Sequence, residues 1–343
     1  MPMDFLTTLT AGALFEAALA SSGVYSPSVI ISQMQFANSH MLKVFMAASA
    51  SSALVLASFN KLGLTTTKPR PCSSLGLFSR YDGNIIGGCM VGLGMTLTGA
   101  CPGTVLVQLT TGIRSGWYIM AGGILGGILY TRFSGYLCLR QASISSDADL
   151  TVYGMYGVKG YHAVLVYELL CLVVISFVTV FGPKGTTVPL HPLLGGVLIG
   201  AAQAASLVLT GNPVGVSTGY EVVGSYFWQT LDSLFGYKSR KPSAPLKSVY
   251  FAAGIVAGSW VLVRSVPPTI LETGVDVSVV RGTIGGLVMV LGTRLAGGCT
   301  SGHGISGMSM LSVSSLVTVA FMFFSGFGSA LFIWWSSRLT YIL

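Results

Sequence analysis

Two cysteines in related glycine-rich segments are the residues of this chain best suited to chemistry. Cys101 lies in the segment GACPGT, and Cys299 lies in GGCTSGHG. A thiol is a weak hydrogen-bond donor whose sulfur is soft and polarisable. It poorly suits sulfate or phosphate, whose oxygens prefer N–H donors, and it suits an anion that ends in a sulfur atom. The two thiols therefore predict contact with a small sulfur-containing anion.

The residues that flank the two cysteines favour the close approach of an anion. Glycine lets a ligand come near the backbone, and the free N–H groups at the start of a helix attract negative charge. We therefore expect the binding segments to include Gly99, Pro102 and Gly103 around the first cysteine, and Thr300, Ser301 and Gly302 around the second.

Two ionisable residues near the second cysteine are further candidates for the binding site. Arg294 precedes Cys299 by five residues in an otherwise apolar segment, where a charge is often functional. It either contacts the anion or forms a structural ion pair with Glu16 or Glu168. His303 follows Cys299 by four residues, and it either donates a hydrogen bond to the anion or caps the turn.

The remaining cysteines carry no recognisable metal or redox motif. The chain has six cysteines, and no two of them form a C-x-x-C pair. Cys138 and Cys171 lie in apolar runs and are expected to pack as small hydrophobic residues. The sequence also lacks a nucleotide-binding loop. We therefore expect no metal, no other cofactor and no direct use of ATP.

A fourfold internal repeat places the two cysteines at equivalent positions. Segments that begin at Gly12, Gly88, Gly196 and Gly286 align without a gap. Their fourteenth position is occupied by Tyr25, Cys101, Leu209 and Cys299. Each copy then contains a pair typical of a helix start, namely Ser26-Pro27, Cys101-Pro102, Asn212-Pro213 and Thr300-Ser301.

The repeat predicts an all-α polytopic membrane protein of about thirteen helices. Each unit reads as a long helix, a glycine-rich break, a short re-entrant helix of about ten residues and a second long helix. We expect an inverted-repeat arrangement in one membrane transport domain, 1–343, with units at 5–59, 84–138, 194–266 and 282–335 and an extra transmembrane helix at 161–182. Transporters use such broken helices near the bilayer midplane; alternatively, the breaks are ordinary loops outside the bilayer.

Composition agrees with a chain whose solvent is mostly lipid. Hydrophobic residues make up 52% of the 343 positions, and charged residues make up only 8%, against roughly 25% in a soluble domain. The net charge of +8 is spread over the loops between apolar segments, which is typical of membrane orientation and not of nucleic-acid binding. We therefore expect a multi-pass protein of the plasma or inner membrane.

The orientation of the chain in the membrane can be predicted from its basic residues once the path of each unit through the bilayer is assumed. We assume that the first long helix and the short helix turn back on one face, and that the third helix then crosses. The face that receives loops 60–82 and 232–247 is then the more basic one, and the positive-inside rule places it in the cytoplasm. The N-terminus is predicted outside and the C-terminus in the cytoplasm.

Two longer segments resemble the loops of a known family. GGCMVGLGMTLTGACPGT and GTRLAGGCTSGHGISG are similar to the signature loops of the YeeE/YedE sulfur transport domain family. The resemblance implies import of thiosulfate, passed between loop cysteines by S–H···S hydrogen bonds, with Cys101 and Cys299 matching two of them. Bacterial transporters of this type carry cysteine where this chain has Tyr25. The resemblance thus implies either that the tyrosine hydroxyl substitutes as a donor or that this chain moves a different sulfur compound.

Two other functions fit the same residues. A membrane-embedded sulfurtransferase-like enzyme would carry a persulfide on Cys101 or Cys299, but such a nucleophile needs an adjacent base and His303 is the only candidate nearby. A channel-like subunit would act with a soluble sulfur-carrier or sulfurtransferase protein, a partner that the resemblance also implies. We therefore favour a transporter of a sulfur anion over an enzyme.

Overall fold

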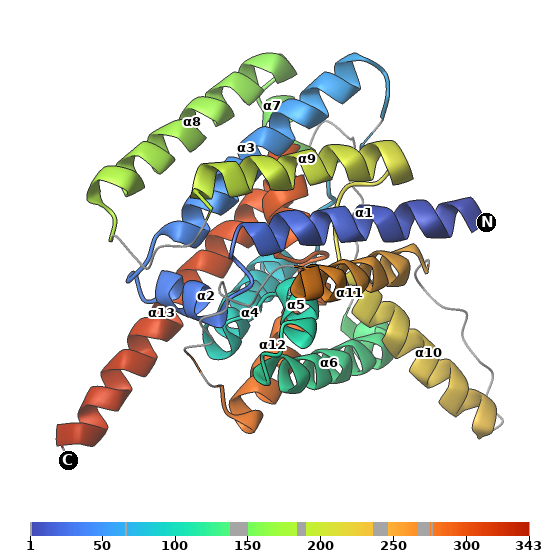
Figure 1. Ribbon diagram of the computed structural model, residues 1–343, viewed down its shortest axis with the longest axis vertical. Coiled ribbons are helices and arrows are strands. Elements are labelled where there is room, and N and C mark those ends of the chain that lie inside the picture. Colours follow the sequence, from blue (N-terminus) through green and yellow to red (C-terminus); the bar gives the residue numbers. More distant parts are fainter. Residues whose placement is uncertain are drawn as a thin grey trace.

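A computed structural model describes residues 2–65, 67–137, 150–183, 190–235, 246–265, 275 and 277–342. Within these ranges the chain forms fourteen helices and no β-strand (Figure 1). The predicted all-α membrane fold is confirmed. The predicted ends of the second and third units, residues 138 and 266, lie outside the described residues.

The helices recur four times in sets of three, and the first, second and fourth sets have the order long, short, long. The first and second units are α1 (Pro2–Ser21), α2 (Pro27–Met34), α3 (His40–Lys61), α4 (Asp82–Thr98), α5 (Thr104–Thr110) and α6 (Ser115–Leu137). After α7 (Val152–Met155) and the extra helix α8 (Gly160–Phe181), the third and fourth units are α9 (Pro192–Thr210), α10 (Thr218–Leu234), α11 (Lys247–Ser265), α12 (Val279–Leu295), η3 (Thr300–Gly307) and α13 (Val313–Ile342). The middle helix of the third unit, α10, has 17 residues and not about ten.

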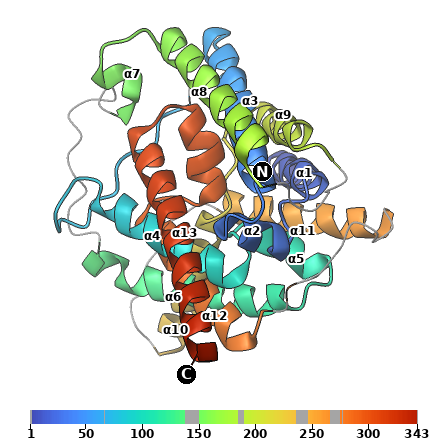
Figure 2. The ribbon, with the colours of Figure 1, turned by 90° about the vertical axis from the view of Figure 1, so that its left-hand side faces the viewer.

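Several helices have the length and composition of membrane spans. In the described part of the chain these are α3, α8, α9, α11 and α13, and the bent pair α12 and η3 forms a sixth if it is counted as one broken span. Helix α8 packs against α3 at the outside of the bundle (Figure 2). Most of its large apolar side chains are exposed, as expected for a surface that faces lipid.

The four units pack as two interlocked pairs. Helix α1 of the first unit lies against α9 and α11 of the third unit, and α9 lies against α3. Helix α4 of the second unit lies in the same way against α12 and α13 of the fourth unit, and α12 lies against α6. No unit therefore buries its long helices by itself, and the repeat is stable only as a whole.

Contacts between the first and third units give the direction of their helices. Gly195 at the start of α9 meets Ser22 at the end of α1, so these two helices are antiparallel (Figure 1). Gly196 and Gly200 of α9 meet Ala47 and Ser51 of α3 in ascending order, so α9 and α3 are parallel. The first and third helices of a unit consequently run in opposite directions.

The second and fourth units show the same directions. Gly94 of α4 meets Met289 of α12, and Gly285 of α12 meets Leu97 of α4, so these helices are antiparallel. Gly122 of α6 meets Thr283 of α12 and Gly126 meets Leu291, in ascending order, so α12 and α6 are parallel. In each of these units the third helix thus runs opposite to the first, after the break and the middle helix. The assumption that the third helix continues in the direction of the first is wrong.

Glycines allow the backbones of crossing helices to touch. A Cβ atom on Gly92 of α4 would overlap the carbonyl oxygen of Met322 on α13. A Cβ atom on Gly12 of α1 would overlap the carbonyl oxygen of Phe251 on α11. Helices in lipid associate largely through such close packing of small residues, which accounts for many of the 45 glycines of the chain.

A pair of matched substitutions tests this packing. Gly92→Ala should lower the melting temperature of the detergent-solubilised protein by about 5 °C or more, because the added methyl group forces α4 and α13 apart. Gly328→Ala on the same α13 should leave the melting temperature unchanged or raise it, because a Cβ there meets no atom within 4 Å. Equal melting temperatures for the two variants would contradict the role of the glycine crossing.

Candidate functional site

The breaks of the first two units lie together. Gly99 ends α4 with a φ of 63°, and a Cβ there would lie 2.8 Å from the Cβ of Pro27 at the start of α2. The side-chain amide of Gln108 on α5 donates hydrogen bonds to the carbonyl oxygens of Tyr25 (2.8 Å) and Gly99 (3.1 Å). A single amide therefore joins both breaks.

The breaks of the third and fourth units also lie together. The Ser306 hydroxyl on η3 donates to the carbonyl oxygen of Val214 (3.0 Å). The Val214 N–H donates in turn to the side-chain oxygen of Gln203 on α9 (3.2 Å). Because the long helices between the two pairs of breaks are antiparallel, the pairs enter the bundle from opposite sides.

Cys101 starts the short helix of the second unit. Its N–H donates to the Thr104 hydroxyl (2.7 Å), and the Thr104 N–H donates to the Cys101 sulfur (3.4 Å). The carbonyl oxygen of Pro102 accepts a hydrogen bond from the Tyr220 hydroxyl of α10 (3.0 Å). The Cys101 loop is thereby tied to the opposite half of the molecule.

Cys299 lies at the start of η3 and is more deeply buried. Its side chain is 2% exposed, and its sulfur lies 3.2 Å from the Ser301 hydroxyl. The backbone N–H groups of Val216, Ser217 and Gly302 face the sulfur. The segment winds as a π-helix, a wider form that recurs at functional sites. Here the sulfur sits among donors suited to negative charge.

The two cysteine loops share a small cavity at the centre of the bundle. Its volume is about 50 Å³; Cys101, Gly103 and Thr104 line one wall, and Thr300, Ser301 and Ile305 line the other. The remaining wall consists of apolar residues from α1, α3 and α9. The structure thus brings Cys101 into contact with the same space as the loop that carries Cys299.

Arg70 is a part of this site that the sequence did not indicate. It comes from the connection between α3 and α4, and it donates to the carbonyl oxygens of Gly302 (2.9 Å) and Gly297 (2.9 Å). Its own carbonyl oxygen accepts from the hydroxyls of Ser312 and Ser314 (3.0 Å each). In the sequence Arg70 is one of several basic loop residues, and no spacing links it to Cys299.

A polar cavity lies on the outer side of Arg70. Its volume is about 260 Å³, and its lining includes Arg70, Lys247, Ser217, Thr218 and Thr8. Two basic side chains and several hydroxyl groups make this cavity suitable for an anion. The Cys299 loop is therefore flanked by the central cavity on one side and by a basic vestibule on the other.

His303 caps the turn after α12, which was one of the two expected roles, whereas Arg294 has a partner that was not expected. The Nε2 atom of His303 lies 3.0 Å from the Ala296 carbonyl oxygen, and Nδ1 lies 2.9 Å from the Ser315 hydroxyl. We assign the proton to Nε2 because a carbonyl oxygen can only accept. Arg294 forms an ion pair with Glu221 of α10, not with Glu16 or Glu168. Both side chains thus hold the Cys299 loop in place and are engaged by protein groups.

The other candidates are distributed more widely. Tyr25 is buried near the first break, and its hydroxyl interacts electrostatically with Glu16. Cys171 is buried on α8 away from both cysteine loops, and Cys138 lies outside the described residues. In the described part of the chain, no three His, Cys, Asp or Glu residues are grouped as metal ligands.

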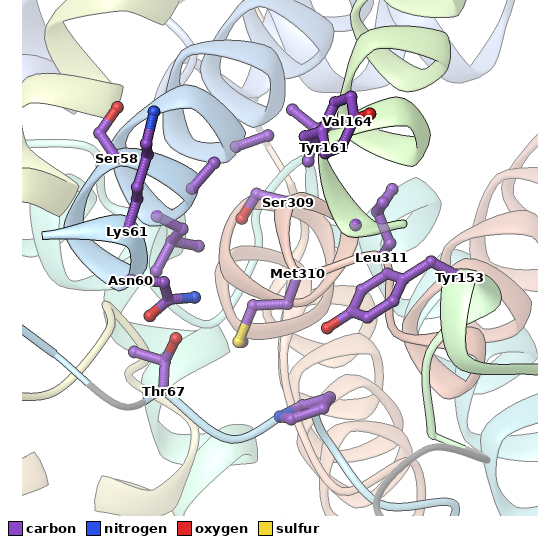
Figure 3. A pocket seen from close by; sticks show the side chains of 15 residues that line it. Ser58, Asn60, Lys61, Thr67, Tyr153, Tyr161, Val164, Ser309, Met310 and Leu311 are labelled. Carbon is purple, nitrogen blue, oxygen red and sulfur yellow. The ribbon is translucent and has the colours of Figure 1, made fainter. Parts of the chain in front are cut away.

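A larger cavity lies away from the cysteines (Figure 3). Its volume is about 540 Å³, and it lies between the end of α3, the start of α8 and the segment after η3. Lys61, Asn60, Tyr161 and Ser309 are among its lining residues. It contains none of the predicted site residues and is mostly apolar, so its size does not make it the substrate site.

Comparison with known proteins identifies the family of the chain. The family described as sulphur transport matches residues 21–328, which include all four breaks. The chain belongs to the sulphur transport family. The resemblance of the two cysteine loops is thereby confirmed, and the family's named transporters agree with a multi-pass membrane protein that moves a sulfur anion.

Individual relatives are similar over different lengths. The chain is 24% identical over 341 residues to the thiosulfate transporter TsuA of Spirochaeta thermophila, covering 92% of this chain and 94% of that protein. It is 31% identical over 146 residues to a probable transporter of Xylella fastidiosa, covering 41% of this chain and 93% of that protein. A relative of about half the length that matches almost end to end agrees with the internal repeat.

The Arg294–Glu221 pair provides a test of its structural role. Arg294→Gln and Glu221→Gln should each lower the melting temperature in detergent by about 5 °C, because each leaves a poorly solvated charge without its partner. The double variant should lose less than the sum of the two single losses. A transport defect confined to Arg294→Gln, with additive melting temperatures, would instead indicate that Arg294 contacts the anion.

Proposed function

We propose that this protein carries thiosulfate, or a closely related anion that ends in sulfur, across the membrane between Cys101 and Cys299. The observation that supports this most is the central cavity, where two cysteine loops from opposite sides of the bundle meet. The TsuA relative, a thiosulfate transporter, supports the choice of substrate.

The chemistry of the site suits a soft dianion. A protonated thiol at Cys101 donates an S–H bond to the terminal sulfur of the anion, and the sulfonate oxygens accept from hydroxyl groups such as that of Ser301. At Cys299 the surrounding N–H groups and Arg70 stabilise the negative charge. Passage between the two sites exchanges one set of weak bonds for another, so neither site holds the anion too tightly.

Tyr25 stands where related bacterial transporters have a third cysteine. In the proposed path it lies at the mouth formed by the first two breaks, before Cys101. Its hydroxyl donates to an oxygen of the anion and replaces a thiol donor with a harder one. This exchange keeps a donor at the mouth and leaves selectivity for the terminal sulfur to Cys101 and Cys299.

The helix directions revise the proposed orientation. Thr8 of α1, Arg70 and Lys247 line one cavity, so the N-terminal half of α1 lies on the same side as the basic loops. The sequence led us to expect those loops and the N-terminus on opposite sides of the membrane. The shared cavity supports placing them on the same side. By the positive-inside rule, we propose a cytoplasmic N-terminus, an external C-terminus and uptake in the order Tyr25, Cys101, Cys299, Arg70.

Uptake by the purified protein in liposomes tests the transport function. Labelled thiosulfate should enter, and excess sulfate should compete poorly because it lacks a terminal sulfur. Cys101→Ala and Cys299→Ala should each reduce uptake about 5- to 150-fold, which corresponds to the loss of about 1–3 kcal/mol of hydrogen bonding to a charged group. Ser at either position should be intermediate, because it keeps a donor but not the soft sulfur.

Cys171→Ala is the matched control, because this thiol is buried on α8 and lies away from both loops. It should transport like the wild type. Normal uptake by Cys101→Ala and Cys299→Ala would refute the thiol path. Turnover of a persulfide donor by a protein that moves no thiosulfate would favour the sulfurtransferase alternative.

Two introduced cysteines test the orientation in a background without Cys72. Ala37 lies in the exposed turn between α2 and α3, and Ser79 is exposed in the connection between α3 and α4. Because α3 separates the two turns, an impermeant thiol reagent added to intact cells should label Ala37→Cys and spare Ser79→Cys. The reverse pattern would place the N-terminus outside.

A further inference from the structure

Glu16 is a buried carboxyl group inside the bundle that the proposed path does not use. It lies on α1, five residues before the first break begins, and it is 0% exposed. Both of its carboxylate oxygens are buried, and within the described residues neither has a partner at hydrogen-bonding geometry, although the Ser259 side chain lies close by. An isolated ionised carboxylate is among the most costly groups to bury, so burial favours the protonated carboxyl group over the carboxylate.

Among the described helices that pack against α1, none places a cation beside Glu16. Helix α1 packs against α5, α9 and α11, and the sequences of α5 and α9 contain no titratable residue. On α11 the charges are confined to its ends, Lys247 and Arg264. Tyr25, at the first break, is the titratable group that interacts with the carboxyl group.

Polar groups nevertheless connect Glu16 to the substrate path. Ser259 of α11 faces the carboxyl group, and its hydroxyl lies 2.5 Å from the hydroxyl of Thr110 at the end of α5. Cys101 lies at the other end of the same short helix. Tyr25 is joined to α5 through Gln108, whose side-chain oxygen is itself buried without a partner.

We propose that Glu16 is a proton-binding site that couples the entry of a proton to the uptake of the anion. This inference rests on the proposed transport of thiosulfate. A dianion beside Tyr25 and Cys101 is repelled by an ionised Glu16 and tolerated by a protonated one. In each cycle one proton enters from outside, resides on the Glu16 carboxyl group while the anion passes, and is released to the cytoplasm. No covalent bond other than the O–H bond forms or breaks.

Coupling the anion to a proton also lowers the electrical work of uptake. A dianion that enters the cell moves two negative charges against an inside-negative potential. One accompanying proton lowers the net charge moved from two to one and lets the proton gradient contribute to uptake. The mouth formed by the first two breaks, which we place outside, is the side from which both the proton and the anion arrive.

The test uses the full-length protein in liposomes that contain a pH-sensitive dye. With wild-type protein, added thiosulfate should acidify the lumen, and uptake should rise as the external pH falls, by at most about tenfold per pH unit for one proton. Glu16→Gln mimics the protonated acid in shape and charge. It should exchange thiosulfate across the membrane at about the wild-type rate, with no acidification and no pH dependence.

Glu168→Gln is the matched control, because Glu168 also lies in a membrane helix, α8, and also has a buried oxygen without a partner. It should keep both acidification and pH dependence. Uptake by the wild type without acidification would overturn the proton site and leave the transport function intact, even if Glu16→Gln did not fold. Acidification by Glu16→Gln, or loss of its exchange activity, would also overturn it, whereas a wild type that moves no thiosulfate would refute both proposals.

Discussion

Every break in a membrane helix exposes backbone groups that lipid cannot satisfy, and the rest of this structure depends on how they are satisfied. Side chains supply the partners, from elsewhere in the chain at the first, third and fourth breaks and from the same unit at the second. Gln108 binds the carbonyl oxygens at the first and second breaks, Ser306 binds the third, and Arg70 and Asn84 bind the fourth. Because an unpaired amide is costly in a low-dielectric interior, each break is stable only in the complete assembly.

The same constraint explains why the two cysteine loops lie against one cavity. A break whose hydrogen-bond partners belong to another unit is held against that unit. The loops at the breaks therefore lie together inside the bundle. Tyr220 ties the Cys101 loop to α10 through the Pro102 carbonyl oxygen. The loops at the breaks and apolar residues of α1, α3 and α9 then enclose a narrow central cavity, whose lining is mostly apolar and includes Cys101, Thr104 and Ser301.

The described interior contains few ionisable side chains, and they lie at different positions. Arg294 is neutralised by Glu221, Arg70 is aimed at carbonyl oxygens and at the Cys299 side of the path, and Glu16 lies on the side of the first two breaks. The two ends of the proposed path therefore differ in their ionisable groups: a basic side chain lies near the proposed exit, and a protonatable acid lies near the proposed entrance.

The sequence by itself determined the class of the protein, its repeat and its two cysteines, because composition, fixed spacing and a specific loop motif are local properties. It did not determine the direction of the third helix in each unit, the ion-pair partner of Arg294, the structural role of His303 or the presence of Arg70 beside Cys299. Those depend on which units interlock. In a chain with so few charges and so many glycines, close backbone packing decides which units pair. No periodicity along the sequence predicts which glycine will contact which carbonyl group.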